Sequence, residues 1–224
     1  LHEPLRAGWG DAAIADPTTR AAAWPVLQVA AEAGLGERFE LAPGVWGTGG
    51  SAPHDAADSD AAIAARAIGQ DAVRATPLGI ARLVSMVASG GEIPAPRLDP
   101  DRDVARRRVL SRSAAERLQA ALSAVVVKGT AARAFADHPW RSLVLGKTGS
   151  AQRIDARGMP RTDSWFAGAV LPPDDLEGNP VVIVVALPGA GLGGRHAAEV
   201  ADEVSRAVIV ANGWDRSEVV TARW

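Results

Sequence analysis

Hydrophobic and polar residues follow two different patterns along this chain. Over residues 1–135 apolar side chains recur at spacings of three and four, which predicts amphipathic helices. Over residues 136–224 short apolar runs alternate with clusters of Pro, Gly, Asp and Asn, which predicts strands joined by turns and then a terminal helix. The chain therefore divides into a mainly helical part, 1–135, and a part with strands and a terminal helix, 136–224.

Helix boundaries follow from residues that cap helix ends. Thr76 before Pro77 is typical of a helix start, and Gly90-Gly91 ends the same helix. The stretch from Ser113 to Glu116 has the form of a capping box. The predicted helices are 19–33, 61–68, 76–89, 113–128 and 195–211, and the predicted loops or connectors are 44–59 and 94–108.

The strands are expected at 143–145, 164–171 and 181–187, with a short further strand at 219–224. Because the run 181–187 is apolar on both faces, we expect it at the centre of the sheet. Short turn clusters between the strands favour antiparallel pairing. The pattern thus predicts an α/β fold with a mostly antiparallel sheet and flanking helices.

Charge and cysteine content exclude several kinds of partner and site. The 224 residues carry a formal net charge of −2, so no basic surface indicates a nucleic-acid partner. The absence of cysteine excludes disulfides and thiolate metal sites. The longest apolar run is far shorter than a bilayer requires, and the chain does not open on a signal peptide. We therefore expect any membrane anchor or export signal outside this sequence.

A few polar residues invite a functional interpretation but have simpler ones. Ser59, with an aspartate on each side, is interpreted as a helix cap, because the cluster lacks the ring of oxygens that a metal ion needs. His138 and His196 are expected at the surface. We expect no metal and no cofactor.

Two glycine-rich stretches resemble phosphate-binding loops only in part. Gly146-Lys147-Thr148 has the second half of a phosphate loop, but Arg141 stands where the first glycine is needed. Farther along, Gly189, Gly191 and Gly194 have the spacing of a dinucleotide-binding loop between a strand and a helix. The following segment offers no acidic residue at a strand end, so we interpret these glycines as a turn. A nucleotide-binding domain remains the least favoured alternative.

The stretch Lys147-Thr148-Gly149-Ser150 also suits acyl transfer. An ammonium and a hydroxyl on a strand at the edge of a sheet attract a substrate carboxylate. Glycine leaves room for a ligand beside the strand, and a backbone N–H beyond it can stabilise a developing oxyanion. Lys-Thr-Gly followed by a hydroxyl residue is the third motif of the penicillin-recognising serine enzymes.

Further segments extend this likeness in order and at compatible spacing. They are "AIGQDAVRATPLGIARLVSMVASGGEIPAPRL" from Ala67, "AVVVKGTA" from Ala124, "GKTGSAQ" from Gly146, "DSWFAGAV" from Asp163 and "GGRHAAEVA" from Gly193. Together they resemble the penicillin-binding protein transpeptidase family over roughly residues 61–210. The resemblance implies a β-lactamase/transpeptidase-like fold in which part of an all-helical subdomain accompanies the sheet. The whole chain, 1–224, would then be a partial domain of this kind.

The family's chemistry is acylation of a serine by a D-Ala-D-Ala stem peptide, followed by transfer to an amine, and β-lactams mimic that dipeptide. By resemblance, Lys147 and Thr148 bind the substrate carboxylate, Gly149 gives clearance, and the Ser150 N–H supplies half of the oxyanion hole. The implied partners are a stem peptide or β-lactam, and possible cell-wall synthesis proteins. The implied location is extracytoplasmic, with a membrane tether in sequence outside this chain.

The sequence departs from the family at its other two motifs. The only lysines are Lys128 and Lys147, and valine stands three residues before each, so no SxxK is present. No SxN is present either, and Gly8-Trp9-Gly10 aligns with its position. The chain therefore contains no catalytic nucleophile or base of the family. We favour a C-terminal portion of a transpeptidase domain with SxxK upstream, and the alternative is a non-catalytic pseudo-transpeptidase that binds muropeptide or a cell-wall protein partner.

Overall fold

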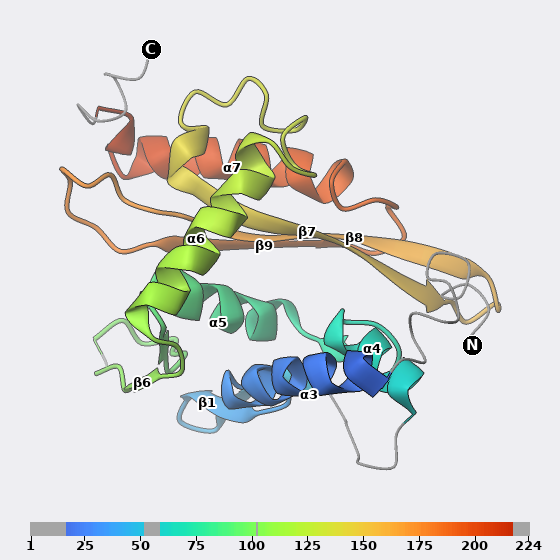
Figure 1. Ribbon diagram of the computed structural model, residues 1–224. Helices are drawn as coiled ribbons and strands as arrows, with labels where there is room; N and C mark the ends of the chain where they lie inside the picture. The colour runs from blue at the N-terminus through green and yellow to red at the C-terminus, as the bar shows by residue number, and fades with distance from the viewer. Residues whose placement is uncertain (1–16, 52–58, 102, 217–224) are drawn as a thin grey trace.

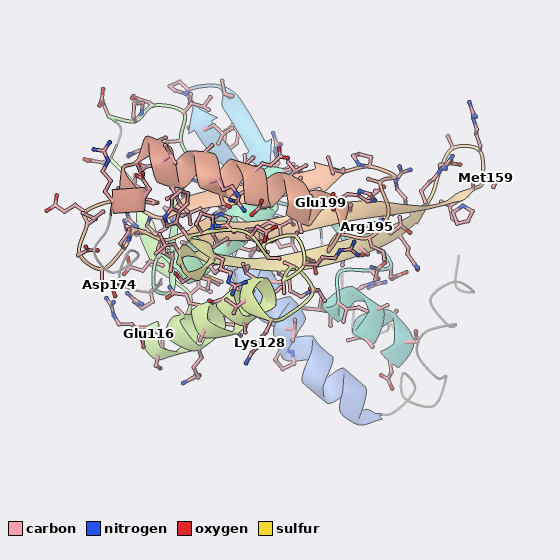
Figure 2. The ribbon with its side chains drawn as sticks, turned by 90° about the horizontal axis from the view of Figure 1, so that it is seen from above. Glu116, Lys128, Met159, Asp174, Arg195 and Glu199 are labelled. Atoms are coloured by element: carbon pink, nitrogen blue, oxygen red, sulfur yellow. The ribbon has the colours of Figure 1, made fainter. Side chains whose placement is uncertain are left out.

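The computed structural model describes residues 17–51, 59–101 and 103–216. Its largest sheet has three strands, β7 (Val144–Ile154), β8 (Pro160–Val170) and β9 (Val181–Leu187), in the order β7-β8-β9 and antiparallel throughout. The predicted antiparallel sheet is therefore confirmed. Its strands β7 and β8 are longer than predicted and extend beyond β9 as a two-stranded ribbon, with Met159 near the tip (Figure 2).

The prediction that 181–187 is the central strand is wrong within the described residues. There β8 lies at the centre and β9 at an edge. The strand β9 is apolar on both faces because helix α5 (Pro77–Ala88) covers one face of the sheet and helix α7 (His196–Ala211) covers the other (Figure 1). An apolar strand needs burial on both faces, and helices supply that burial here without a second neighbouring strand. The predicted strand at 219–224 lies outside the described residues.

The two faces of the sheet bury different sets of side chains, as the period of two in a strand requires. Val144 and its partner Val170 face α7, and Leu145 and its partner Ala169 face α5. The α7 side holds the larger cluster, which includes Phe135, Phe166, Ile183, Ile209 and Trp214. Phe135 stacks on Phe166 with ring centroids 5.7 Å apart. Helix α6 (Arg112–Val127) packs against β7 and crosses the sheet obliquely in Figure 1.

The first part of the chain contains helices α3 (Pro17–Glu32) and α4 (Asp60–Ala67), which pack together. Three small antiparallel pairs accompany them. These are β1 (Arg38–Ala42) with β2 (Val45–Thr48), β3 (Gly50–Ser51) with β4 (Arg74–Ala75), and β5 (Glu92–Pro94) with β6 (Arg106–Arg108). Short 3-10 turns cover Arg141–Leu143 and Trp214–Arg216.

These pairs correct the prediction of loops at 44–59 and 94–108. The first pair forms because Gly44 adopts a positive φ of 77° at the turn and donates its N–H to Glu40 Oε1 at 3.0 Å. Each of the three pairs is short, and all three arginines of β6 are exposed. None of these segments therefore shows the buried alternation that marks a strand in sequence. Residues 52–58 lie outside the described part.

The helices predicted at 19–33, 61–68, 76–89 and 195–211 are confirmed within two residues as α3, α4, α5 and α7. Thr76 Oγ1 accepts the Gly79 N–H at 3.0 Å, as a capping threonine should. Ser59 Oγ accepts the Ala62 N–H at 3.2 Å, which confirms its interpretation as a cap. The capping box at Ser113 is wrong, because α6 begins earlier and Ser111 caps it by accepting the Ala114 N–H at 3.2 Å. In the described residues, no helix is both long and apolar enough to cross a bilayer.

His138 corrects a further prediction, since it is buried with 1% of its surface exposed. Its Nδ1 accepts the Trp140 N–H at 3.1 Å, so the ring proton is on Nε2, which donates to Ser205 Oγ at 2.9 Å. Ser205 in turn donates to the Asp202 carbonyl at 2.8 Å. Burial lowers the pKa of His138 from 6.5 to about 4, against an opposing contribution from Asp202. His196 is exposed, as predicted.

We expect His138 to make the fold sensitive to mild acid. Between pH 6.5 and 4 the unfolded chain binds a proton at this residue and the folded chain does not, so stability falls as the pH drops through this window. The loss approaches about 3 kcal/mol near pH 4. Urea unfolding at pH 7 and pH 4.5 measures it, with His138→Gln as a non-titrating variant and His196→Gln as the exposed control. Equal pH dependence of the parent and the His138→Gln variant contradicts this assignment.

Candidate functional site

Lys147, Thr148, Gly149 and Ser150 lie in the middle of β7, with their backbone paired to residues 164–167 of β8. The other edge of β7 has no partner strand in the described part of the chain. An unpaired edge presents free N–H and C=O groups along which an extended peptide can bind. The sequence predicted a strand only at 143–145 but expected Lys147 and Thr148 on a strand at a sheet edge, and the structure extends that strand to Ile154.

Lys147 and Thr148 point to opposite faces of β7, because successive strand residues alternate. Lys147 is exposed and Thr148 is 7% exposed. The Lys147 ammonium donates to the Thr148 carbonyl oxygen at 2.5 Å and forms no ion pair with any described residue. It is therefore a cation at the sheet edge with spare donors for an anionic ligand.

The Thr148 hydroxyl is paired with a residue that sequence reasoning missed. Thr148 Oγ1 lies 2.6 Å from Thr130 Oγ1, just beyond the end of α6. One of these two hydroxyls donates its proton to the other. The second hydroxyl therefore keeps an O–H that it can donate to a ligand. Thr130 lies in the "KGTA" segment, but only the fold brings its side chain to β7.

Gly149 and Ser150 contact the loop that leads into α7. The Gly193 N–H donates to Ser150 Oγ at 3.1 Å, and a Cβ on Gly193 would lie only 2.1 Å from the Gly149 carbonyl oxygen. Ser164, fully buried on β8, fixes this loop by donating to the Leu192 carbonyl at 3.1 Å and accepting the Ala197 N–H at 3.0 Å. The loop thus supports the site strand from the side of α7.

The glycines of the dinucleotide-like pattern belong to this same loop. Gly189 and Gly191 adopt positive φ angles of 70° and 92°, and a Cβ on Gly194 would lie 2.5 Å from the Thr130 carbonyl oxygen. The glycines therefore serve a turn and a close approach to the end of α6. A dinucleotide site needs a parallel β-α-β unit, and the strands described here pair only antiparallel.

Gln70 is a second residue that sequence reasoning missed. It follows α4, and its Nε2 donates to the Ser150 carbonyl oxygen at 3.4 Å. All five segments quoted for the family likeness therefore meet at Lys147–Ser150 or beside it. They contribute Gln70, Thr130, the site strand itself, Ser164 on β8 and Gly193.

Other candidate positions do not join this cluster. Gly8-Trp9-Gly10 lies outside the described residues. An open depression of about 460 Å³, lined by Arg38, Trp46 and Leu78 among others, includes none of the residues of the Lys147–Ser150 strand. Among the described side chains, no group of His, Asp and Glu is arranged to hold a metal ion.

Comparison with known families shows which family this chain belongs to. Residues 27–208 match the family described as the penicillin binding protein transpeptidase domain. The chain belongs to this family. Members generally bind β-lactams and peptidoglycan stem peptides, and their transpeptidase domains typically lie outside the cytoplasm.

Solved structures confirm the fold class. A peptidoglycan glycosyltransferase from Burkholderia ambifaria has a TM-score of 0.65 and 21% identity, over 86% of this chain and 56% of that one. Penicillin-binding protein 3 from Mycobacterium tuberculosis, complexed with ampicillin, has a TM-score of 0.63 and 24% identity, over 85% and 45%. Penicillin-binding protein A from M. tuberculosis, a ceftriaxone acyl-enzyme complex, has a TM-score of 0.60 and 24% identity, over 80% and 42%. This chain thus spans about half the length of these proteins. No curated protein sequence matches it.

Proposed function

We propose that this chain is the substrate-binding portion of a penicillin-binding D,D-transpeptidase domain that cross-links peptidoglycan. The nucleophilic serine and its lysine then belong to an SxxK motif outside this sequence. One observation carries the proposal: the exposed Lys147 ammonium lies on a sheet edge that has no partner strand among the described residues, and all five family-like segments converge there. We further propose that residues 1–224 form part of one domain. Its location is outside the cytoplasm, tethered to the membrane by sequence beyond this chain.

In this proposal each residue of the strand has a distinct role. The Lys147 ammonium on one face of β7 and the hydroxyl pair of Thr148 and Thr130 on the other attract, at the edge that the two faces share, the C-terminal carboxylate of D-Ala-D-Ala or of a β-lactam. Gly149 lets the ligand lie close to the backbone. The Ser150 N–H donates to the oxyanion that forms when the serine attacks the carbonyl carbon. Terminal D-alanine leaves with a proton, and an amine of a second stem peptide then takes the acyl group and releases the serine.

A second candidate rests on a different observation. Gly8-Trp9-Gly10 aligns with SxN, and glycine offers neither a hydroxyl to relay a proton nor an amide side chain to bind a ligand. If that alignment holds in the intact protein, the site strand serves a pseudo-transpeptidase that binds muropeptide or a cell-wall protein partner without acyl transfer.

Penicillin labelling separates these two candidates. We expect the longest native polypeptide that contains this chain to form a covalent adduct with a fluorescent penicillin. We also expect a peptide ending in D-Ala-D-Ala to slow labelling by competition. Gel fluorescence together with intact mass measures both effects. A folded polypeptide that binds penicillin reversibly and acquires no mass favours the pseudo-transpeptidase.

A further inference from the structure

The hairpin of β1 and β2 has one face that is anchored on the rest of the protein. Phe39 and Gly47 are paired across the hairpin and therefore share this face, on which Phe39 is buried. The Arg82 guanidinium lies 4.4 Å from the centroid of the Phe39 ring. Thr76 Oγ1, at the start of α5, donates to the Thr48 carbonyl oxygen at 2.5 Å. These contacts fix the hairpin on α5.

The opposite face of the hairpin presents an exposed tryptophan beside two charged residues. Arg38, Glu40, Trp46 and Thr48 share this face, because paired residues of the two strands point the same way. Trp46 keeps 55% of its surface exposed, and the Arg38 guanidinium lies over its ring, 5.5 Å from the centroid. Tryptophan is a large apolar side chain that proteins bury or place where a partner covers it. Its exposure on an anchored hairpin therefore indicates a binding surface.

Both charged residues beside Trp46 have hydrogen-bonding groups to spare. The Arg38 guanidinium has no hydrogen-bond or ion-pair partner among the described residues. Glu40 Oε1 accepts the Gly44 N–H, and the other oxygen of this carboxylate has no partner in the same ranges. The surface thus offers one cationic donor and one anionic acceptor around an apolar ring. This balance suits a neutral ligand that has an apolar face and both donors and acceptors, and it disfavours an anionic polymer.

A sugar ring has this combination of properties. Trp46 lines the open depression of about 460 Å³ together with Leu41 and Leu78. Small-molecule sites typically measure about 300–1,000 Å³ and have mainly apolar walls with a few polar groups. The C–H groups on one face of a pyranose carry partial positive charge, so they are attracted to the negative face of an indole. The hydroxyl and acetamido groups of an amino sugar both donate and accept hydrogen bonds.

The depression lies within reach of the Lys147–Ser150 strand. Gln70 Nε2 donates to the Ser150 carbonyl oxygen, and Thr76, farther along the same segment, lines the depression. The segment from 70 to 76 spans at most about 20 Å. A stem peptide of about five residues spans at most about 18 Å. A glycan strand whose stem peptide lies along β7 can therefore contact this hairpin.

We propose that the exposed face of the β1–β2 hairpin binds the peptidoglycan glycan strand that carries the acyl-donor stem peptide. This inference rests on the proposed function and adds a second contact with the same substrate. An amino sugar stacks on Trp46, Arg38 donates to its acetamido oxygen, and Glu40 accepts a proton from one of its hydroxyls in a hydrogen bond. Because glycan and stem peptide are covalently joined, the two contacts together favour stem peptides attached to glycan over free ones.

Glycan strands freed of their stem peptides by an amidase test this site in the longest native polypeptide. A chitin hexasaccharide, which has acetamido groups and no carboxylate, is the second probe, and calorimetry gives the dissociation constants. We expect the parent to bind both probes. Trp46→Ala should weaken both affinities about tenfold, the value of one aromatic stacking contact, and Trp46→Phe less than about threefold. Val210→Ala, at a residue of α7 that is also 55% exposed, is the control and should change neither affinity. Melting temperatures verify that each variant is folded.

Oxidation by N-bromosuccinimide, mapped by mass spectrometry, shows which ligand covers Trp46. We expect glycan strands to protect Trp46 from oxidation and a free stem peptide to leave it reactive. Protection by the free stem peptide alone would assign the hairpin to a peptide ligand and overturn the glycan site.

The outcomes separate this inference from the proposed function. A parent protein that reacts with penicillin but binds neither glycan probe, or binds them equally well after Trp46→Ala, overturns the glycan site and leaves the proposed function standing. Glycan binding that depends on Trp46, in a protein that penicillin does not acylate, supports the glycan site and contradicts acyl transfer. A parent protein that neither reacts with penicillin nor binds glycan overturns both proposals.

Discussion

The Lys147→Ala variant of the longest native polypeptide is expected to react with penicillin about 10- to 100-fold more slowly than the parent. The Lys147 ammonium is exposed on the free edge of β7 and makes no ion pair within the described residues, so its charge is available to a ligand carboxylate. A charge-assisted hydrogen bond of this kind stabilises by about 1.5–3 kcal/mol. The measurement is the second-order acylation rate constant at constant ionic strength.

The chain supplies a matched control for this experiment. Lys128 is the only other lysine, and it lies exposed at the C-terminal end of α6 (Figure 2). Lys128→Ala removes the same charge from the protein and should leave the acylation rate unchanged. If the two variants react at the same rate, Lys147 has no specific role in recognition of the carboxylate.

Replacing Gly193 by alanine is expected to lower the free energy of unfolding by about 3 kcal/mol and to weaken penicillin binding as well. The added Cβ would lie 2.1 Å from the Gly149 carbonyl oxygen and 2.5 Å from the Trp165 carbonyl oxygen. Both obstacles are backbone atoms of the sheet, so relief requires the loop or the site strand to move. Chemical unfolding and penicillin titration measure the two effects.

Gly189→Ala distinguishes crowding from a general effect of substituting glycine in this loop. Gly189 has a φ of 70°, but a Cβ there would meet no atom within 4 Å. Its replacement should therefore cost only the strain of a left-handed alanine, about 1–2 kcal/mol, with penicillin binding retained. Comparable losses of penicillin binding in the two variants would show that crowding of the Gly149 carbonyl oxygen by a Cβ at position 193 is not the cause of the weaker binding.

Sequence reasoning predicted the long helices well, because their signals are local. Thr76 caps α5 through its own side chain, and the apolar spacing of α7 reflects a face buried on β9. The small strand pairs were missed because they are short, and because some of them join segments that are distant in sequence. For instance, β3 pairs with β4, although these strands are far apart in sequence. Within the described residues 181–187 is not central, because apolar character reports burial and does not identify the element that provides it.

The strand Lys147–Ser150 could be predicted from a sequence motif, whereas the residues that surround it could not be predicted. Lys147–Ser150 is recognisable as consecutive letters, and the family match supports the likeness drawn from it. Thr130 and Gln70 reach this strand only through the packing of α6 and of the turn after α4. Their residue types are common in turns and at helix ends, so the side-chain partners that give them a role become visible only in the folded chain.

The most direct test of the central claim is the position of the penicillin adduct in the longest native polypeptide, mapped by peptide mass spectrometry. We predict a single acylated serine that precedes Leu1 of this chain and stands three residues before a lysine. That result would make this chain the substrate-binding portion of a working transpeptidase. An adduct on a serine within residues 1–224, or the absence of any adduct on folded protein, would contradict the claim.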